Sequence, residues 1–269
     1  MKLDGSVAIV TGAGGGIGAA LCRRFVEHGA RVVATDLDEG RLKAEVDAIA
    51  ADHPGAIAGL AGDCADTDHI RATIELAESS FGPVDLYVAN AGVGLGDGLD
   101  ATPRDWQVSI DVNLMAHVRA AELLVPGWLE RGSGHFLSTA SAAGLLTQIG
   151  SATYSVTKHA AVAFAEWLSV TYGARGIGVS CLCPMGVNTA MLNGGAESDS
   201  AIARQGAKAV TQAGLVLEPL EVADLVVEKL GTDEFLILPH PDVLEFFRRK
   251  SSDYDRWLRG MRRYQETLA

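Results

Sequence analysis

Short apolar runs alternate with longer amphipathic stretches along most of the chain. The apolar runs are rich in Val, Ile and Leu and have no polar face, as expected of strands buried on both sides of a parallel sheet. Between them, apolar residues recur at the intervals of a helix. We therefore predict an α/β fold, a doubly wound parallel β-sheet of the Rossmann type with helices on both faces. The predicted strands cover residues 6–11, 31–35, 56–61, 83–88, 135–138, 177–182 and 235–238.

Helical periodicity is visible in six stretches between and after these strands. No internal repeat and no linker interrupts the pattern, so we predict one dinucleotide-binding catalytic domain over residues 1–269. The predicted helices cover residues 17–29, 67–81, 103–130, 154–173, 201–210 and 219–230.

Two segments depart from the alternating pattern. Residues 185–214 hold many small residues and no strong apolar face, which favours a mobile substrate lid, with a long surface loop as the alternative. Residues 241–269 carry aromatic residues at roughly helical spacing among many basic ones. We expect this C-terminal helical extension to pack its aromatic face over the substrate cleft or on a partner subunit. The acidic chain as a whole makes a membrane surface an unattractive partner.

The first predicted strand runs directly into a glycine-rich turn, and a helix follows at once. Gly12, Gly16 and Gly18 have the spacing G-x-x-x-G-x-G. Glycine lets a backbone approach a pyrophosphate, and the start of a helix offers free N–H groups and the positive end of its dipole. Such turns also serve tight packing, but strand, glycine turn and helix together favour a dinucleotide site.

An acidic residue, Asp36, ends the second predicted strand, eighteen residues beyond Gly18. A carboxylate at this place accepts hydrogen bonds from both ribose hydroxyls of an adenosine and repels a 2′-phosphate. No Arg or Lys occupies positions 14, 15 or 37 to receive that phosphate. The alternative role for Asp36 is a helix N-cap, which Asp38 can fill instead. We predict NAD in preference to NADP.

Polar residues and turns follow most of the predicted strands directly. Because the carboxyl ends of parallel strands meet at one edge of a sheet, these residues are expected to converge on one site, where strand order reverses. They are the Gly12 turn, Asp36, Asp63, Asn90, Ser141 and Pro184.

Tyr154 and Lys158 lie four residues apart on a predicted helix, so their side chains share a face. A nearby ammonium favours phenolate and lowers the pKa of a tyrosine from about 10, which suits proton exchange with an alcohol or a carbonyl. A packed tyrosine beside a solvated lysine would give the same short pattern. The convergence of strand ends, with Ser141 thirteen residues upstream of Tyr154, favours the catalytic interpretation.

Composition narrows the functional classes. The net charge of −12 and the pI near 5.0 argue against a nucleic-acid-binding protein. No apolar run reaches the ~18 residues of a membrane span, and a first strand at Ser6 leaves no room for a targeting segment, so we expect a cytoplasmic protein. Cys22, Cys64, Cys181 and Cys183 lack the spacing of a metal site, so we expect free thiols and no metal.

Taken together and in this order, the motifs resemble those of the short-chain dehydrogenase/reductase family over roughly residues 3–240. Two positions depart from the family pattern. Ala89 stands where the first Asn of N-N-A-G is usual, and Met185 is inserted into the usual Pro-Gly step. The matching motifs are Thr11–Gly18, Asp63, Asn90–Gly92, Asn113, Ser141, Tyr154-x-x-x-Lys158 and Pro184–Thr189.

The resemblance implies a role for each matching residue. Tyr154 would be the general acid/base, and Lys158 would lower its pKa and hold the nicotinamide ribose. Ser141 would bind the substrate oxygen, and Asn113 would anchor a water in a proton relay. Thr189 would bind the carboxamide, with Asp63 and Cys64 near the adenine. The other implied cofactor-binding residues are Gly12, Gly16, Ile17, Gly18, Asp36, Leu37, Asn90, Ala91, Gly92, Pro184, Gly186 and Val187. The family default is a homotetramer, or otherwise a dimer, built through the Asn113 and Tyr154 helices.

These observations predict an NAD-dependent oxidoreductase that interconverts a secondary alcohol and its ketone, with alcohol oxidation as the expected direction. A mostly apolar cleft suits a hydrophobic substrate. One alternative is an NAD(P)H-dependent carbonyl reductase, and another is a non-catalytic NAD(H)-binding sensor or scaffold. The residues expected near the substrate are Leu145, Leu146, Gln148, Met185, Met191 and Leu192.

Overall fold

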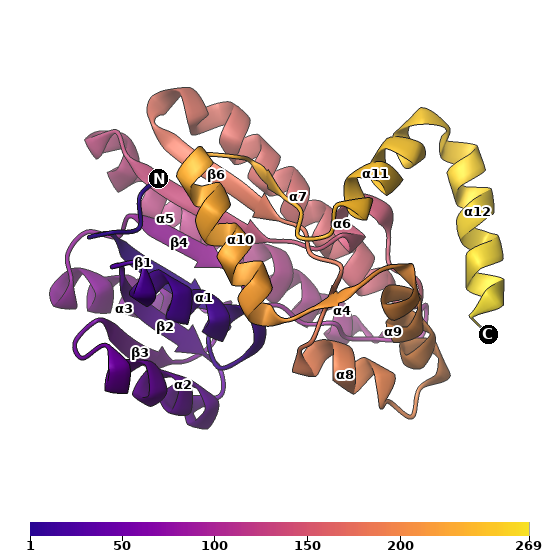
Figure 1. Ribbon diagram of the computed structural model, residues 1–269, viewed down its shortest axis with the longest axis horizontal. Helices are drawn as coiled ribbons and strands as arrows, with labels where there is room; N and C mark the ends of the chain where they lie inside the picture. Colours follow the sequence, from indigo (N-terminus) through magenta and orange to yellow (C-terminus); the bar gives the residue numbers. More distant parts are fainter. Residues whose placement is uncertain (269) are drawn as a thin grey trace.

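A seven-stranded, fully parallel sheet forms the centre of the molecule, and helices cover both of its faces (Figure 1). The computed structural model describes residues 1–268. The strand order is β3-β2-β1-β4-β5-β6-β9, which confirms the predicted doubly wound α/β fold. The strands are β1 (Val7–Thr11), β2 (Arg31–Asp36), β3 (Ile57–Ala61), β4 (Leu86–Ala89), β5 (Gly134–Thr139), β6 (Ile177–Leu182) and β9 (Leu236–Ile237).

Helices follow nearly every strand, as the alternating pattern predicts. They are α1 (Gly16–Glu27), α2 (Glu39–Asp52), α3 (Thr67–Ser80), α4 (Pro103–Ile110), the π-helical turn η1 (Asp111–Met115), α5 (Ala116–Arg131), α6 (Ala143–Leu146), α7 (Ala152–Tyr172), the 3₁₀ turn η2 (Gly173–Arg175), α8 (Ala190–Ala196), α9 (Ala201–Ala213), α10 (Pro219–Thr232), α11 (Asp242–Ser252) and α12 (Tyr254–Thr267). A separate pair of short parallel strands, β7 (Gly186–Val187) and β8 (Val216–Leu217), lies outside the main sheet.

Two apolar cores lie on opposite faces of the sheet. Successive side chains of a strand point to opposite faces, so Val7 and Ile9 of β1 join one core while Ala8 and Val10 join the other. Helices α3, α5 and α7 cover the first core, and α1 and α10 cover the second. Strand β1 pairs with β2 on one side and β4 on the other, so strand order reverses there and a crevice opens beyond their carboxyl ends.

The helix predicted over residues 103–130 is not continuous. It divides into α4, the π-helical turn η1 and α5, and the extra residue of the wide turn is marked by the Ala116 N–H, which donates to Asp111. Apolar periodicity does not reveal such a turn, because it adds one residue without breaking the helix. Its consequence is local: Asn113 is fully buried within the turn.

Residues 185–214 hold more structure than predicted. Helix α8 precedes α9, and the two pack against each other. The Ser200 side chain caps α9, which runs three residues beyond the expected end at Val210. Strands β7 and β8 pair at the two ends of the segment, so it is held at both sides. The helix predicted over residues 201–210 is therefore present as α9, α8 is an additional helix that the sequence did not predict, and closure as a lid stays a prediction.

The C-terminal extension forms two helices, α11 and α12. Asp253 separates them with an extended backbone and caps α12 by accepting from the Arg256 N–H at 2.9 Å. Helix α11 leads away from the body, and α12 turns back toward α9 (Figure 1). At its far end the Tyr264 hydroxyl donates to the Ala209 carbonyl at 2.8 Å. The extension thus forms an arch over the region of the lid segment.

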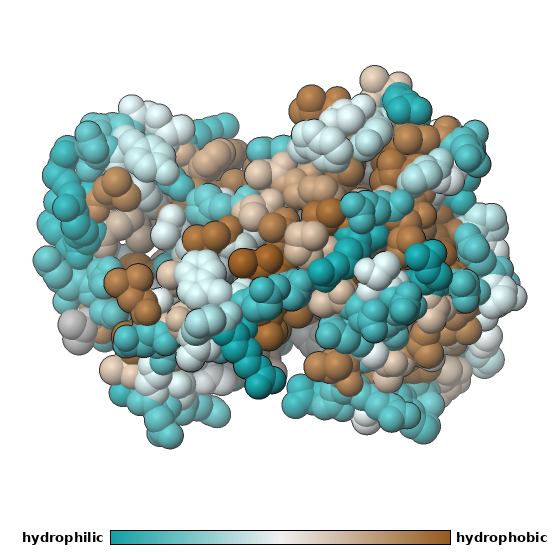
Figure 2. Space-filling model, turned by 180° about the vertical axis from the view of Figure 1, so that it is seen from behind, coloured by the Kyte–Doolittle hydropathy of each residue, from teal (hydrophilic) through white to brown (hydrophobic). Residues whose placement is uncertain are grey.

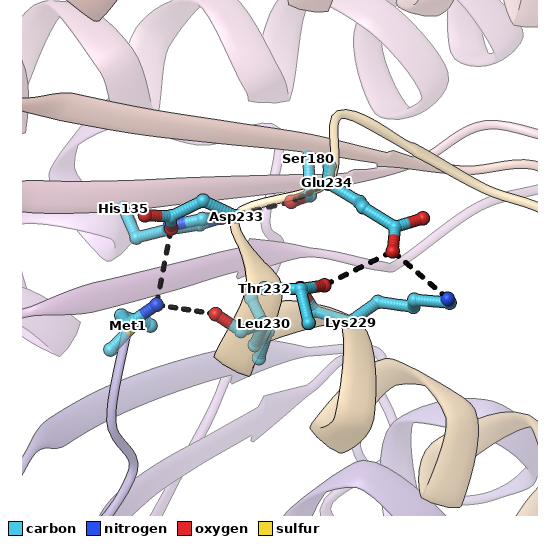
Figure 3. A network of polar contacts seen from close by, with 8 residues as sticks. All are labelled: Met1, His135, Ser180, Lys229, Leu230, Thr232, Asp233 and Glu234. Carbon is cyan, nitrogen blue, oxygen red and sulfur yellow. Dashed lines mark hydrogen bonds and ion pairs between the residues drawn. The ribbon is translucent and has the colours of Figure 1, made fainter.

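A network of polar contacts lies at the amino ends of β5 and β9, at the end of the sheet that is opposite the crevice (Figure 3). The amine of Met1 donates to the Leu230 carbonyl and to Asp233. The Ser180 hydroxyl donates to the Glu234 carbonyl at 2.8 Å and contacts His135 at 3.1 Å. These contacts hold the short strand β9 to the sheet, on the side away from the crevice.

Candidate active site

A cleft of about 450 Å³ lies at the carboxyl ends of the central strands. It brings together residues that the sequence spreads over nearly 180 positions. The predicted site residues that line it are Gly12, Gly16, Ile17, Asp36, Asn90, Ala91, Gly92, Ser141, Tyr154, Lys158, Pro184, Val187 and Thr189. The convergence expected from the parallel sheet is therefore present in the structure.

The glycine turn after β1 is too tight for side chains. A Cβ on Gly18 would lie 2.0 Å from the Gly12 carbonyl oxygen, and Gly12 itself has φ +67°. The Asn90 amide closes the turn by donating to the Thr11 carbonyl at 2.9 Å. Only glycine fits both positions without moving the backbone.

The first turn of α1 presents free N–H groups to this cleft. Its N-cap, Gly15, supplies no side-chain hydrogen bond, and no acidic residue lies in the first turn. By contrast, Asp38 caps α2 and Asp66 caps α3 through side-chain oxygens. An anionic group at the start of α1 would receive the N–H groups and the positive end of the dipole. The turn and the helix start together fit the pyrophosphate of a dinucleotide.

Asp36 reaches the cleft from the end of β2. One carboxylate oxygen accepts from the Gly14 N–H at 2.9 Å and the other from the Asp38 N–H at 3.0 Å. Asp38, and not Asp36, caps α2 by accepting from the Arg41 N–H at 3.0 Å. Asp36 is thus not the N-cap of α2, because Asp38 fills that position. The Asp36 carboxylate is instead held beside the glycine turn.

Arg41 also lines this end of the cleft, which the sequence argument missed. Arg41 approaches from the first turn of α2, whereas positions 14, 15 and 37 on the neighbouring turns hold no basic residue. Its Nε lies 3.2 Å from the Asp38 carboxylate. Arg41 could have been predicted from the sequence, because it stands three residues after the N-cap Asp38 and therefore lies on the first turn of the helix beside Asp36.

Five predicted cofactor residues lie outside the lining of the cleft. They lie in or beside α1, β2, β3 and β7. Asp63 accepts from the Ala65 N–H at 2.8 Å in the turn after β3, and Leu37 is 76% exposed. The five are Gly18, Leu37, Asp63, Cys64 and Gly186.

Lys158 is the most deeply buried of the predicted catalytic residues apart from Asn113. Its Nζ donates to the Thr139 carbonyl at 2.9 Å and lies 5.7 Å from the centre of the Tyr154 ring. Burial lowers the pKa of Lys158 to about 8. The pKa of a buried lysine depends strongly on the groups that contact its Nζ, because a nearby charge or hydrogen bond favours one protonation state over the other.

The pKa of Tyr154 differs from the sequence expectation. Burial of the phenol raises its pKa above the ordinary value of 10, and a hydrogen bond with Ser141 opposes this shift. The expected lowering by Lys158 does not prevail, because desolvation of the buried phenol is the larger effect on its pKa. In the protein alone Tyr154 is therefore a protonated phenol, ready to donate.

Asn113 fixes the loop that follows β4. Its side chain accepts from the Val93 N–H at 2.8 Å, donates to the Val93 carbonyl at 2.9 Å and donates to the Thr157 hydroxyl at 3.0 Å. Gly92 packs tightly beside it, because a Cβ there would lie 3.2 Å from the Nζ of Lys158. The π-helical turn thus directs Asn113 toward α7. Its predicted role in a water relay stays a prediction.

His117 is a buried residue that no sequence motif marks. Its Nδ1 lies 3.1 Å from the Ser138 hydroxyl, and its Nε2 has no partner among residues 1–268. Burial, aided by the charge of Lys158, lowers the pKa of His117 to about 3. A single histidine inside an amphipathic helix carries no pattern that distinguishes it from a surface residue.

Acidification is expected to destabilise the protein through His117 and His135. Burial lowers the pKa of His135 to about 4, so both histidines are neutral when folded and take up protons near pH 6.5 when unfolded. The unfolded state then binds more protons, and stability falls as pH falls below 6.5. We expect a loss of roughly 2–4 kcal/mol between pH 7 and pH 5, measured by urea unfolding.

The matched control for this expectation is His28→Asn, at an exposed histidine. It should leave the pH dependence unchanged, whereas His135→Asn should make it shallower. A free energy of unfolding that stays constant between pH 7 and pH 5 would show that the two buried histidines are not neutral in the folded state.

The substrate side of the cleft is mainly apolar. Of the residues expected near a substrate, Gln148, Met185, Met191 and Leu192 line it, and Leu146 lines an adjoining cavity. Leu145 is buried behind them and lines neither space. Leu145 faces the core because α6, which the sequence did not predict, turns its side chain inward.

Within residues 1–268, no group of three or more His, Cys, Asp or Glu side chains is arranged to hold a metal ion. No helix in this part of the chain combines the length and the apolar character needed to cross a membrane.

Comparison with known proteins identifies the family. A family profile described as short chain dehydrogenase matches residues 6–199. The chain belongs to the short-chain dehydrogenase/reductase family. Among curated relatives, the 1-deoxy-11-beta-hydroxypentalenate dehydrogenase of Streptomyces avermitilis is 35% identical over 246 residues, which cover 90% of this chain and 87% of the relative.

Solved structures of the family share the whole architecture. A short-chain dehydrogenase/reductase from Burkholderia phymatum, solved in complex with NAD, is 30% identical with a TM-score of 0.85 over 95% of this chain and 96% of its own. The L-sorbose reductase of Gluconobacter frateurii, solved with NADPH and L-sorbose, is 26% identical with a TM-score of 0.77 over 88% of this chain and 95% of its own. Structures that resemble this chain have therefore been solved with each of the two cofactor types.

Proposed function

We propose that this short-chain dehydrogenase/reductase uses NAD to interconvert a secondary alcohol and its ketone. The observation that carries the proposal is the placement of Ser141, Tyr154 and Lys158 in one cleft with Asp36 and the glycine turn. The NAD molecule, when bound, supplies the hydride chemistry at its nicotinamide ring. The protein supplies orientation and one proton transfer.

The catalytic residues divide the proton transfer between them. Tyr154 exchanges a proton with the substrate oxygen, and Ser141, which hydrogen bonds to Tyr154, holds that oxygen in place. The Nζ of Lys158 lies over the Tyr154 ring, 5.7 Å from its centre, and takes part by its positive charge, which favours the phenolate form of Tyr154. Burial of this group excludes water from the step.

The preference for NAD rests on the Asp36 carboxylate. It is held by two backbone N–H groups at the phosphate turn, so it cannot swing away from a nucleotide ribose. A 2′-phosphate placed there would meet a fixed negative charge. Arg41, the basic residue nearby, already pairs with Asp38. The relative solved with NAD supports the preference, and the one solved with NADPH shows the alternative within the family.

The proposed substrate is hydrophobic, because the substrate side of the cleft is lined mainly by apolar side chains such as Met185, Met191 and Leu192. The Streptomyces relative is named as a dehydrogenase of a hydroxylated compound, which agrees with alcohol oxidation. An NAD(P)H-dependent carbonyl reductase on the same site is the second candidate. A non-catalytic sensor is disfavoured by the complete set of proton-transfer residues.

We also propose a homo-oligomer built through α5 and α7. Helix α7 carries three large apolar side chains that solvent reaches, Val156, Trp167 and Val170, at 53%, 52% and 86% exposure. An apolar helix face of this kind is a common contact between copies of one chain.

A comparison of cofactors tests this function. A panel of hydrophobic secondary alcohols and ketones is offered with NAD, NADP, NADH and NADPH, and the absorbance of the reduced nicotinamide is followed. We expect turnover with at least one alcohol and a preference for NAD over NADP of more than about tenfold in kcat/KM, as expected for an unfavourable contact of more than about 1.4 kcal/mol. A preference for NADPH would contradict the assignment of Asp36.

A further inference from the structure

A second cavity, of about 400 Å³, lies beneath the C-terminal arch and adjoins the cleft. The hollow between α12 and the body of the molecule is visible at the left of Figure 2. Both spaces share lining residues, so the second cavity extends the substrate side of the cleft. The shared residues are Ala142, Ala143, Gln148, Ile149, Met185 and Val210.

Specific contacts hold the walls of this chamber. The Nζ of Lys250, which is buried, donates to the Leu145 carbonyl at 2.7 Å and fixes α11 to α6. At the other end of the arch, the Gln205 amide donates to the Gln265 carbonyl at 3.1 Å. The chamber is thus built from helices that are fastened at both ends. Its walls are apolar and include Leu146, Phe246, Trp257 and Met261.

Among residues 1–268, Arg249 is the one charged residue in the lining of this chamber. Its side chain is 64% exposed and stands at the rim. Its Nε–H donates to Glu245, one turn earlier in α11, at 2.9 Å. The two Nη groups have no acceptor among residues 1–268, so the forked end of the guanidinium is available to a ligand. Glu245 does not line the chamber.

We propose that the chamber holds the apolar body of the substrate and that Arg249 binds a carboxylate at its end. The substrates are then hydrophobic carboxylic acids that carry a secondary hydroxyl. This inference rests on the proposed function for the reacting hydroxyl, which lies at Tyr154. An apolar cavity with one polar point is the usual form of a site for such an amphipathic ligand, and a guanidinium matches a carboxylate in shape and charge.

The charge balance at the rim favours a monoanion. One guanidinium faces the chamber, and Glu245 already offsets part of its charge. The dianionic head of a phosphate ester would have a single cation for two negative charges on a chain of net charge −12. A carboxylate is therefore the better match.

Binding of two simple amphiphiles tests the inference without any turnover. Dodecanoate and 1-dodecanol have the same chain and differ in the charge of the head group. Isothermal titration calorimetry on the intact protein is expected to show dodecanoate binding about tenfold more tightly, as expected for one exposed, charge-assisted hydrogen-bonded pair. In Arg249→Ala the two probes should bind equally. In Arg248→Ala, at a neighbouring arginine outside the chamber, the difference should remain.

A third variant sharpens the result. Glu245→Gln removes the competing carboxylate and should tighten dodecanoate binding by about threefold while leaving 1-dodecanol unchanged. Equal binding of both probes to the wild-type protein would overturn the inference, as would the same loss in Arg248→Ala and Arg249→Ala. Absence of binding by either probe, as expected if a second copy of the chain fills the chamber, would overturn it too. If the binding results hold but no alcohol is oxidised, the proposed function fails and the chamber assignment stands.

Discussion

Replacement of Tyr154 by Phe is expected to lower kcat by about a thousandfold while leaving the affinity for NAD nearly unchanged. The phenol hydroxyl is the group in the cleft placed to exchange a proton with the substrate oxygen, and general acid–base catalysis is worth about a hundredfold to ten-thousandfold. The ring itself stays, so packing around Lys158 is preserved. Steady-state turnover and cofactor titration on the same preparation separate the two effects.

The matched control is Tyr172→Phe, at the far end of the same helix. It removes a hydroxyl from α7 without reaching the cleft and should leave kcat within about twofold. If Tyr154→Phe retained full turnover of an accepted alcohol, another group would have to carry the proton, and the site as described would not be the catalytic one.

Replacement of Asp36 by Ser is expected to reduce the preference for NAD over NADP by about a hundredfold in kcat/KM. The substitution removes the fixed negative charge that a 2′-phosphate would meet, a loss of roughly 2–3 kcal/mol of discrimination. Serine retains an acceptor for the Gly14 N–H that Asp36 now binds at 2.9 Å, so the phosphate turn is preserved. Initial rates with both cofactors give the ratio directly.

Asp38→Ser is the control for this change. Serine can still cap α2, where Asp38 accepts from the Arg41 N–H. Loss of the Asp38 carboxylate also frees Arg41 from its ion pair, so a modest gain with NADP is expected from this variant. If the two variants changed the ratio equally, discrimination would depend on Arg41 and not on Asp36.

The central layer of the molecule could be predicted because its strands are buried on both faces. Such strands must be continuous apolar runs, so β1 and β6 are visible directly in the sequence, with bounds correct to one residue. A parallel sheet then forces its carboxyl ends together. For this reason residues as far apart as Gly12 and Pro184 could be assigned to one site without any knowledge of contacts.

The parts that could not be predicted depend on contacts between elements. The π-helical turn at Asn113 follows from side-chain bonds to Val93 and Thr157, which no periodicity encodes. The raised pKa of Tyr154 follows from burial, whereas the i, i+4 spacing shows only its neighbour Lys158. The C-terminal extension divides into two helices at Asp253, although aromatic residues recur on both sides of it. In the sequence, the division is indicated by this one N-capping residue.

The central claim is that Tyr154 accepts the hydroxyl proton of a secondary alcohol while NAD accepts the hydride from its carbinol carbon. The most direct measurement uses a secondary alcohol accepted by the protein, with deuterium on its carbinol carbon, and follows the label by mass spectrometry. We predict that the wild-type protein transfers the deuterium to the nicotinamide ring of NAD and that Tyr154→Phe transfers it at least about a hundredfold more slowly. Oxidation of the alcohol with the deuterium released to water, or with equal rates in the two proteins, would contradict the account.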